Sequence, residues 1–179
     1  MINIIVFFDC GDTLVDESTQ FFEDKAVKQA ELIPGTLETL SILRKRGHRI
    51  AMVADGYTAS FQNLFRQHDI AKFFDVIVIS EEVGRTKPDP RMFLTAMERM
   101  GLVPQDVSRI VMIGNNLACD ITGANKLGIY SVLLTYSPRY NMTPSTELEK
   151  PDARTASLGE LPALIEQLES RFTRLGHIK

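Results

Sequence analysis

The chain has 179 residues, 44% of them hydrophobic, which suits one globular domain over residues 1–179 with a complete hydrophobic core. Its formal net charge of -3 is spread along the chain without a basic block, which argues against nucleic-acid binding through phosphate contacts. Two cysteines, Cys10 and Cys119, form neither a disulfide framework nor a zinc pattern, so we expect a protein of the reducing cytoplasm.

Short apolar runs alternate with helical patterns along the chain, which is typical of β-α-β units around a parallel sheet. The first run is too short to span a membrane and lacks the features of a signal peptide, so it predicts a buried strand. The five predicted strands are residues 2–8, 49–53, 76–80, 110–113 and 131–134. Their Val, Ile and Leu content is typical of strands that are covered on both faces.

Helical patterns follow these strands. The first places Leu37, Leu40 and Leu43 at helical spacing and is followed by Gly47, a common signal for a helix end. The predicted helices are residues 36–46, 58–68, 90–100, 120–127 and 161–168. The proline-containing segment between the last strand and the last helix predicts a loop. The alternation predicts an α/β fold of three layers around a doubly wound parallel sheet.

Ligands of such a sheet bind just beyond the carboxyl ends of its strands. A carboxylate at the end of a buried strand, as at Asp9, is costly unless something uses or neutralises it. The residues that follow the predicted strands are 9–13, 54–56, 80–87 and 114–116, with Asp120 one helical turn later. Carboxylates, a lysine and glycine turns together predict a site for phosphate and a hard cation such as Mg²⁺. We expect Asp55, Gly56 and Lys87 to face the phosphate.

Four segments at these strand ends carry a family resemblance. They are FFDCGDTL, VADG, EEVGRTKPDPRMF and VMIGNNLACDITGANKLG, in this order along the chain. Together they resemble the haloacid dehalogenase superfamily, whose hydrolases are mostly Mg²⁺-dependent phosphatases that act through a phosphoaspartate. The resemblance covers nearly the whole chain, and it implies the Rossmann-like core of that superfamily and a phosphatase activity.

The resemblance also implies roles for individual residues. Asp9 would be the nucleophile and a metal ligand, Gly11 would offer its backbone carbonyl to the metal, and Thr13 would order the loop. Lys87 would neutralise the phosphate and the nucleophile. The residues Asn115 and Asp120 would complete the Mg²⁺ site. A carboxylate becomes a useful nucleophile when a metal and a lysine offset its repulsion of phosphate.

Three positions depart from the pattern of the superfamily. Its phosphatases carry a second aspartate, the general acid, where this chain has Gly11, and Asp12 is expected to cap the turn instead. The phosphate-binding Ser or Thr of the family is Ala54 here, and a metal-binding aspartate is Asn115. Without a general acid we expect a slow enzyme, or one restricted to good leaving groups such as acyl phosphates and aryl esters.

The segment between Thr13 and Pro34 is too short for the helical cap that is usually inserted there, so we expect no sizeable cap domain. Open sites in this superfamily accept bulky or macromolecular phosphates, or are covered by a second copy of the chain. We therefore expect a phosphorylated substrate that is a small molecule or a macromolecule. One alternative is a phosphate-binding or protein-interaction member of the same fold with weakened catalysis. Another is a phosphoryl-accepting receiver domain of similar topology.

Overall fold

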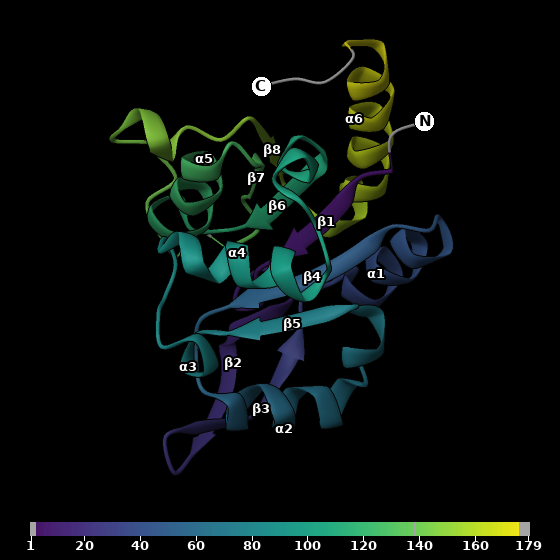
Figure 1. Cartoon of the computed structure of the whole chain (residues 1–179). Coiled ribbons are helices and arrows are strands. Elements are labelled where there is room, and N and C mark those ends of the chain that lie inside the picture. Colours follow the sequence, from purple (N-terminus) through teal and green to yellow (C-terminus); the bar gives the residue numbers. More distant parts are fainter. Residues whose placement is uncertain (1–2, 138, 176–179) are drawn as a thin grey trace.

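The structure is a computed structural model that describes residues 3–137 and 139–175. Its centre is a six-stranded sheet with the strand order β5-β4-β1-β6-β7-β8, in which all neighbouring strands are parallel (Figure 1). The strands are β1 (Ile5–Phe8), β4 (Arg49–Ala54), β5 (Val76–Ile79), β6 (Ile110–Gly114), β7 (Tyr130–Leu134) and β8 (Ala153–Thr155). The predicted doubly wound parallel sheet is confirmed.

Five of these strands correspond to the predicted ones, with differences at their ends. The first begins at Ile5, and Ile2 of the predicted strand lies outside the described residues. Ser80 does not close β5 but begins the short helix α3 (Ser80–Val83). The segment predicted as a loop before the last helix contains β8, whose three residues lie at the edge of the sheet and give too short a pattern to detect.

Helices lie on both faces of the sheet, as predicted. The longer helices are α1 (Thr36–Lys45), α2 (Thr58–His68), α4 (Pro90–Arg99), α5 (Thr122–Leu127) and α6 (Leu161–Leu175). Short 3₁₀ helices occur at Ala71–Phe73, Pro104–Arg109, Glu147–Glu149 and Leu158–Glu160. The helix predicted over residues 120–127 is divided, since a π-helical segment (Leu117–Ile121) precedes α5.

Two hydrophobic clusters fill the space between the sheet and its helices. Alternate side chains of β1 point to opposite faces, as the geometry of a strand requires. Val6 and Phe8 pack in the cluster that contains Leu40 of α1 and further residues from α2 and α6. Phe7 packs with Phe93 of α4 in the other cluster. The arrangement is therefore a three-layer sandwich, and the strand ends that carry the site are fixed from both sides.

An antiparallel hairpin that the sequence did not predict lies between β1 and α1. It consists of β2 (Val15–Glu23) and β3 (Ala26–Leu32), and it extends beyond the main sheet beside α2 (Figure 1). The N–H of Val27 donates to Oγ of Ser60 at 3.0 Å, and Nδ2 of Asn63 donates to the Val27 carbonyl at 2.9 Å. The hairpin occupies the position of the absent cap and is attached to α2.

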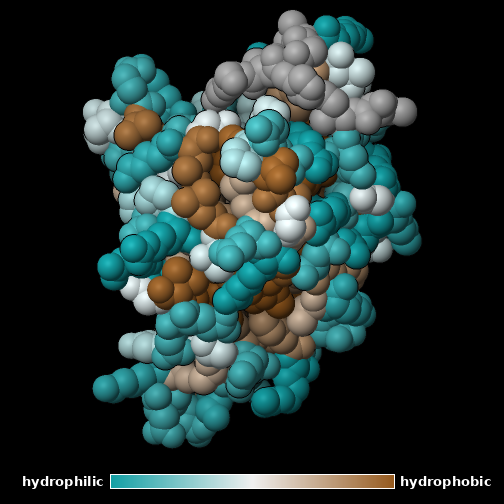
Figure 2. Space-filling model, viewed as in Figure 1, coloured by the Kyte–Doolittle hydropathy of each residue, from teal (hydrophilic) through white to brown (hydrophobic). Residues whose placement is uncertain are grey.

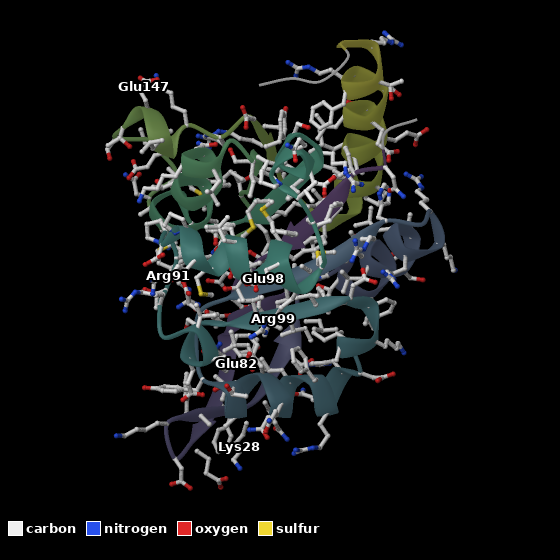
Figure 3. All side chains as sticks on the ribbon, viewed as in Figure 1. Lys28, Glu82, Arg91, Glu98, Arg99 and Glu147 are labelled. Carbon is white, nitrogen blue, oxygen red and sulfur yellow. The ribbon has the colours of Figure 1, made fainter. Side chains whose placement is uncertain are left out.

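The surface mixes polar and apolar residues. Figure 2 shows apolar patches on the face that carries α4, separated by polar residues. Figure 3 shows Glu82 of α3 beside Arg99 of α4, whose Nη1 lies 3.2 Å from Oε2 of Glu82. Of the helices within the described residues, none combines the length and the hydrophobicity that crossing a membrane requires.

Candidate active site

Three charged side chains from distant parts of the chain meet at the carboxyl end of the sheet. Asp9 directly follows β1, and its N–H donates to the carbonyl of Ile113 on the neighbouring strand β6 at 2.9 Å. Lys87 comes from the loop between α3 and α4, and Asp120 comes from the π-helical segment after β6. The strand-end rule predicted that these three residues would lie together, and the structure brings them together.

The ammonium group of Lys87 holds the two carboxylates. Its Nζ donates to Oδ1 of Asp9 at 2.5 Å, to Oδ1 of Asp120 at 2.7 Å and to the carbonyl of Val53 at 2.9 Å. All three donors of the group are therefore used. The side chain of Lys87 is 3% exposed and that of Asp120 is 1% exposed, whereas that of Asp9 is 11% exposed. Asp9 is the charged group of the three that solvent reaches.

Burial and mutual charge set the protonation of this cluster. Burial alone would lower the pKa of Lys87, but the carboxylates of Asp120, Asp9 and Asp55 outweigh it, and the pKa of Lys87 is raised. Burial, and next the charge of Asp9, raise the pKa of the Asp120 carboxyl above its usual range, although Lys87 opposes this. The ammonium ion is thus fixed in its charged form, as neutralisation of a phosphate requires.

The loop after Asp9 is a tight turn organised by one carbonyl. The oxygen of Cys10 accepts the N–H groups of Thr13, Leu14 and Val15 at 3.3, 2.8 and 3.0 Å. Oγ1 of Thr13 donates to Oδ2 of Asp9 at 3.3 Å. Thr13 therefore holds the carboxylate oxygen that Lys87 does not bind, and the loop fixes the orientation of the Asp9 side chain.

Asp12 is turned away from this cluster and stabilises the turn. It adopts a left-handed conformation with φ of 50°, and its side chain is buried. Oδ1 accepts the N–H of Glu17 at 3.0 Å, and Oδ2 accepts a short hydrogen bond from Nε of Arg139. Both carboxylate oxygens are engaged, which agrees with the expected capping role.

The expected metal ligands Asp9, Gly11, Asn115 and Asp120 provide oxygen atoms, but only the two aspartates among them can carry a negative charge. Among the described residues, no group of three or more His, Cys, Asp and Glu side chains is arranged to hold a metal ion. The buried amide nitrogen of Asn115 has no hydrogen-bond partner within the described part of the chain. This nitrogen is a donor that a phosphate or water oxygen would satisfy, whereas Mg²⁺ would bind Oδ1 of the same amide. Mg²⁺ often takes only one or two carboxylates with substrate and water, so the oxygens of Asp9, Asp120 and Asn115 fit it.

The turn after β4 offers less to a phosphate than its sequence indicates. The N–H of Gly56 donates to Oγ of Ser80 at 2.9 Å, and Ala54 has no hydroxyl. Oδ1 of Asp55 accepts the N–H of Lys87 at 3.1 Å, and burial raises the pKa of the Asp55 carboxyl. Asp55 thus positions the Lys87 loop, and this turn presents no side-chain hydroxyl to a phosphate.

A pocket of about 170 Å³ lies beside Gly11, between the hairpin and α2. Its walls are formed by Cys10, Gly11, Val15, Glu17, Gln20, Phe22, Lys25, Val27, Asp55, Gly56, Tyr57, Ser60, Phe61 and Leu64. Larger hollows of about 720 Å³ along α6 and about 1140 Å³ beside α4 do not border Asp9. The small pocket is bordered by Cys10 and Gly11, the two residues that directly follow Asp9.

Two residues near Gly11 were not predicted. Glu17 of β2 lines the small pocket, and Nε of Arg139 lies 3.6 Å from its Oε2. Burial, and next the charge of Asp12, raise the pKa of the Glu17 carboxyl, while Arg139 lowers it. No strand-end rule selects them, because Glu17 lies within a polar strand and Arg139 lies in a loop far along the chain.

The two cysteines next to site aspartates are not activated thiols. Burial raises the pKa of Cys10 far above its usual range, and burial raises the pKa of Cys119 to about 11. Asn116 caps the following helical segment by accepting the N–H groups of Ala118 and Cys119. These neighbours shape the loops and leave the charged cluster as the chemical centre.

Comparison with known proteins identifies relatives for this arrangement. The family model of haloacid dehalogenase-like hydrolases matches residues 23–128. The chain is 29% identical over 155 residues to the glyceraldehyde 3-phosphate phosphatase of Methanopyrus kandleri, covering 87% of this chain and 65% of that protein. It is 32% identical over 146 residues to the phosphoglycolate phosphatase of Escherichia coli K12, covering 81% of this chain and 56% of that protein. The chain thus spans about half to two thirds of the length of these two relatives.

Solved structures support the same relationship. A HAD phosphatase from Thermococcus onnurineus has a TM-score of 0.65 and 26% sequence identity, over 76% of this chain and 59% of that chain. A protein from Listeria monocytogenes serotype 4b is similar in fold, with a TM-score of 0.77 and 22% identity over 93% of this chain and 99% of that chain. The family model spans more than half of the chain, and its matched segment includes Lys87 and Asp120. The chain belongs to the haloacid dehalogenase-like hydrolase family.

Proposed function

We propose that this chain is a Mg²⁺-dependent phosphatase that transfers a phosphoryl group first to Asp9 and then to water. The observation that supports it most is the clamp on Asp9. Lys87 and Thr13 bind its two carboxylate oxygens, and its side chain is more exposed than those of Lys87 and Asp120. A carboxylate that is held in one orientation and reachable from solvent has the properties of a nucleophile.

The charge of the cluster supports a divalent cation as cofactor. When both carboxyls are ionised, Asp9, Asp120 and Lys87 together carry one net negative charge, and this repels a phosphate dianion. Mg²⁺ held by Asp9, the Gly11 carbonyl, Asn115 and Asp120 would reverse that charge and stabilise the phosphoryl oxygens. Asn115 brings an amide instead of a carboxylate, so we expect its contribution to Mg²⁺ affinity to be small.

The reaction follows from these positions. One carboxylate oxygen of Asp9 attacks phosphorus, the bond from phosphorus to the leaving oxygen breaks, and Asp9 becomes an acyl phosphate. Lys87 offsets the charge of the phosphoryl oxygens, and the Asp55 carboxylate keeps the backbone of Lys87 in place. Water then attacks phosphorus and releases inorganic phosphate, which restores the Asp9 carboxylate.

Small phosphate monoesters are the substrates that fit best. The relatives are named for glyceraldehyde 3-phosphate and phosphoglycolate, which are both small. The pocket of about 170 Å³ beside Gly11 suits a leaving group of a few carbon atoms, with Asp55 and Gly56 in its wall. Hairpin residues such as Glu17 and Phe22 form part of the pocket wall, which favours small phosphates over the macromolecular ones that an uncovered site would accept.

A second candidate is a phosphate-binding member of the family without turnover. The phosphate side of the site favours it, because the Gly56 N–H is bound to Ser80 and Ala54 offers no hydroxyl. Such a protein would bind phosphate esters through the charge of Lys87 but would not hydrolyse them to inorganic phosphate. A location in the cytoplasm, one domain over residues 1–179 and association with a second copy remain predictions from the sequence.

Phosphate release by the purified chain tests the proposal. Alkyl phosphates, aryl phosphates and acyl phosphates would be assayed with Mg²⁺ and with EDTA, beside an Asp9→Asn variant. We expect turnover that requires Mg²⁺ and that the variant lacks. If the wild-type chain binds phosphate esters but releases inorganic phosphate no faster than Asp9→Asn, the second candidate is supported.

A further inference from the structure

The space beside Gly11 is filled by a carboxyl group from another strand. A Cβ atom on Gly11 would lie 2.0 Å from Oε1 of Glu17 and 2.9 Å from its Cδ. The φ of Gly11 is not in the left-handed region, so its backbone does not require glycine. The carboxyl of Glu17 occupies the place where a side chain at position 11 would begin.

The backbone of Glu17 is held by Asp12, and its side chain lines the pocket. Its N–H donates to Oδ1 of Asp12 at 3.0 Å, which attaches the start of β2 to the loop that carries Asp9. Its Oε2 lies 3.6 Å from Nε of Arg139, and its side chain is 30% exposed. The carboxyl lines the pocket of about 170 Å³ that also borders Asp55. A leaving group that departs from Asp9 into this pocket therefore passes Glu17.

Two neighbouring carboxyls accept other hydrogen bonds, and the neighbouring thiol is buried. Both oxygens of Asp12 accept hydrogen bonds, from Glu17 and Arg139. Cys10 is buried. Asp55 also lines the pocket, but its Oδ1 accepts the N–H of Lys87 and so holds the loop of the phosphate-binding lysine. Glu17 is the pocket carboxyl whose oxygens accept no backbone hydrogen bond from the described residues.

We propose that Glu17 is the proton donor for the leaving oxygen, in the place that residue 11 leaves free. This rests on the proposed phosphatase function. As the bond from phosphorus to the leaving oxygen breaks, its electron pair stays on that oxygen and the Glu17 carboxyl gives it a proton, so an alcohol leaves and Glu17 becomes a carboxylate. In the second step Glu17 takes a proton from the attacking water, and the carboxyl is restored.

Leaving-group dependence tests this role. Glu17→Gln would be compared with wild type and with Glu31→Gln, the same change at an exposed position of the hairpin, on an alkyl phosphate, 4-nitrophenyl phosphate and acetyl phosphate. We expect Glu17→Gln to lose about 10² to 10⁴-fold in kcat on the alkyl phosphate. Its rates on the two substrates with good leaving groups should fall much less. An equal loss on all three, or no loss on any, would overturn the proposal.

A double variant tests the place of the carboxyl independently. The Glu17→Ala change removes the carboxyl that lies beside position 11, and the Gly11→Asp change places a carboxyl on residue 11 itself. We expect this protein to hydrolyse the alkyl phosphate faster than the single variant Glu17→Ala. Circular dichroism and urea midpoints would first show that both variants fold like wild type. Equal rates of the double variant and Glu17→Ala would then contradict the proposal.

The outcomes separate this inference from the phosphatase function. If wild type is active, Asp9→Asn is inactive and Glu17→Gln retains its full rate on the alkyl phosphate, only the role of Glu17 fails. If Asp55→Asn instead shows the selective loss on the alkyl phosphate, Asp55 is the donor and Glu17 is not. If wild type releases no phosphate from any of the three substrates with Mg²⁺, both proposals fail together.

Discussion

Lys87 and Asp9 come from loops 78 residues apart, and Nζ of the lysine lies 2.5 Å from Oδ1 of the aspartate. The same ammonium group lies 2.7 Å from Oδ1 of Asp120. One cation thus stabilises two carboxylates in a region that water barely reaches. The contact links the stability of the site to its proposed chemistry, because the residue proposed to neutralise phosphate also stabilises two carboxylates.

Replacement of Lys87 by methionine should destabilise the metal-free protein. Two carboxylates would remain buried without a cation, and breaking a buried ion pair in this way costs about 3–5 kcal/mol. The pKa of Lys87 is raised above its ordinary value of 10.5, so its contribution is complete below pH 10.5 and is lost only at higher pH. Without Lys87 the already raised pKa of the Asp120 carboxyl rises further, so urea unfolding should show a loss at pH 7 that is as large or larger at pH 9, with exposed Lys126→Met as control. A loss that disappears at pH 9 would contradict this.

Asp9 and Asp12 should separate activity from stability. Asp9→Asn leaves Lys87 paired with Asp120, so we expect it to abolish turnover with little change in the free energy of unfolding. Asp12→Asn removes the charge that Arg139 binds at a buried position, and it should cost about 1–2 kcal/mol. Its rate should fall less than that of Asp9→Asn. Phosphate release and urea unfolding of both variants measure this, and the reverse pattern would show that the two aspartates have exchanged roles.

Gly114→Ala should displace the side chain of Asp120, which packs against Gly114. A Cβ on Gly114 would lie 2.3 Å from Cγ of Asp120 and 2.6 Å from its Cβ. Asp120 has to move away from Lys87, and crowding of this kind costs about 1–3 kcal/mol. We expect weaker Mg²⁺ binding in calorimetry together with this loss of stability. Gly159→Ala, whose Cβ would meet no atom closer than 4.0 Å, is the matched control. An unchanged Mg²⁺ affinity in Gly114→Ala would argue against Asp120 as a ligand.

Asn115→Asp should strengthen metal binding and weaken the metal-free fold. The amide nitrogen of Asn115 is buried and has no partner within the described residues, and a carboxylate there adds charge for Mg²⁺ but repels the other carboxylates. We expect the Mg²⁺ dissociation constant to fall by about tenfold or more, and the urea midpoint in EDTA to fall as well. Asn116→Asp, at a helix cap beside it, should show a smaller gain. Equal gains in the two variants would mean that Asn115 is not a ligand.

The sheet and the charged cluster were predictable because both depend on local patterns. Apolar runs mark the parallel strands, and the residues after them must meet at one edge, which placed Asp9, Lys87 and Asp120 together. The hairpin was missed for a physical reason. β2 is mostly polar and partly exposed, and its turn uses Asp24 and Lys25 in left-handed conformations instead of a turn signal with glycine.

Contacts between residues far apart in the chain could not be predicted from the sequence. The ion pair of Arg139 with Asp12 joins residues 127 positions apart, and neither residue shows a pattern that predicts it. The absence of a side chain at Gly11 was visible, but the carboxyl that fills its space was not, since Glu17 reaches it only after the hairpin folds back. Sequence patterns therefore located the centre of the site, and tertiary structure was needed to complete its wall.

The most direct measurement is to find the phosphoryl group on the protein. The chain would be mixed with Mg²⁺ and a phosphate ester carrying labelled phosphorus, quenched with acid within the first turnover, digested and mapped by mass spectrometry. We predict label on the peptide that contains Asp9, lost after longer incubation and absent from Asp9→Asn. Turnover without label on that peptide, or label that persists in Asp9→Asn, would contradict a phosphoaspartate at Asp9.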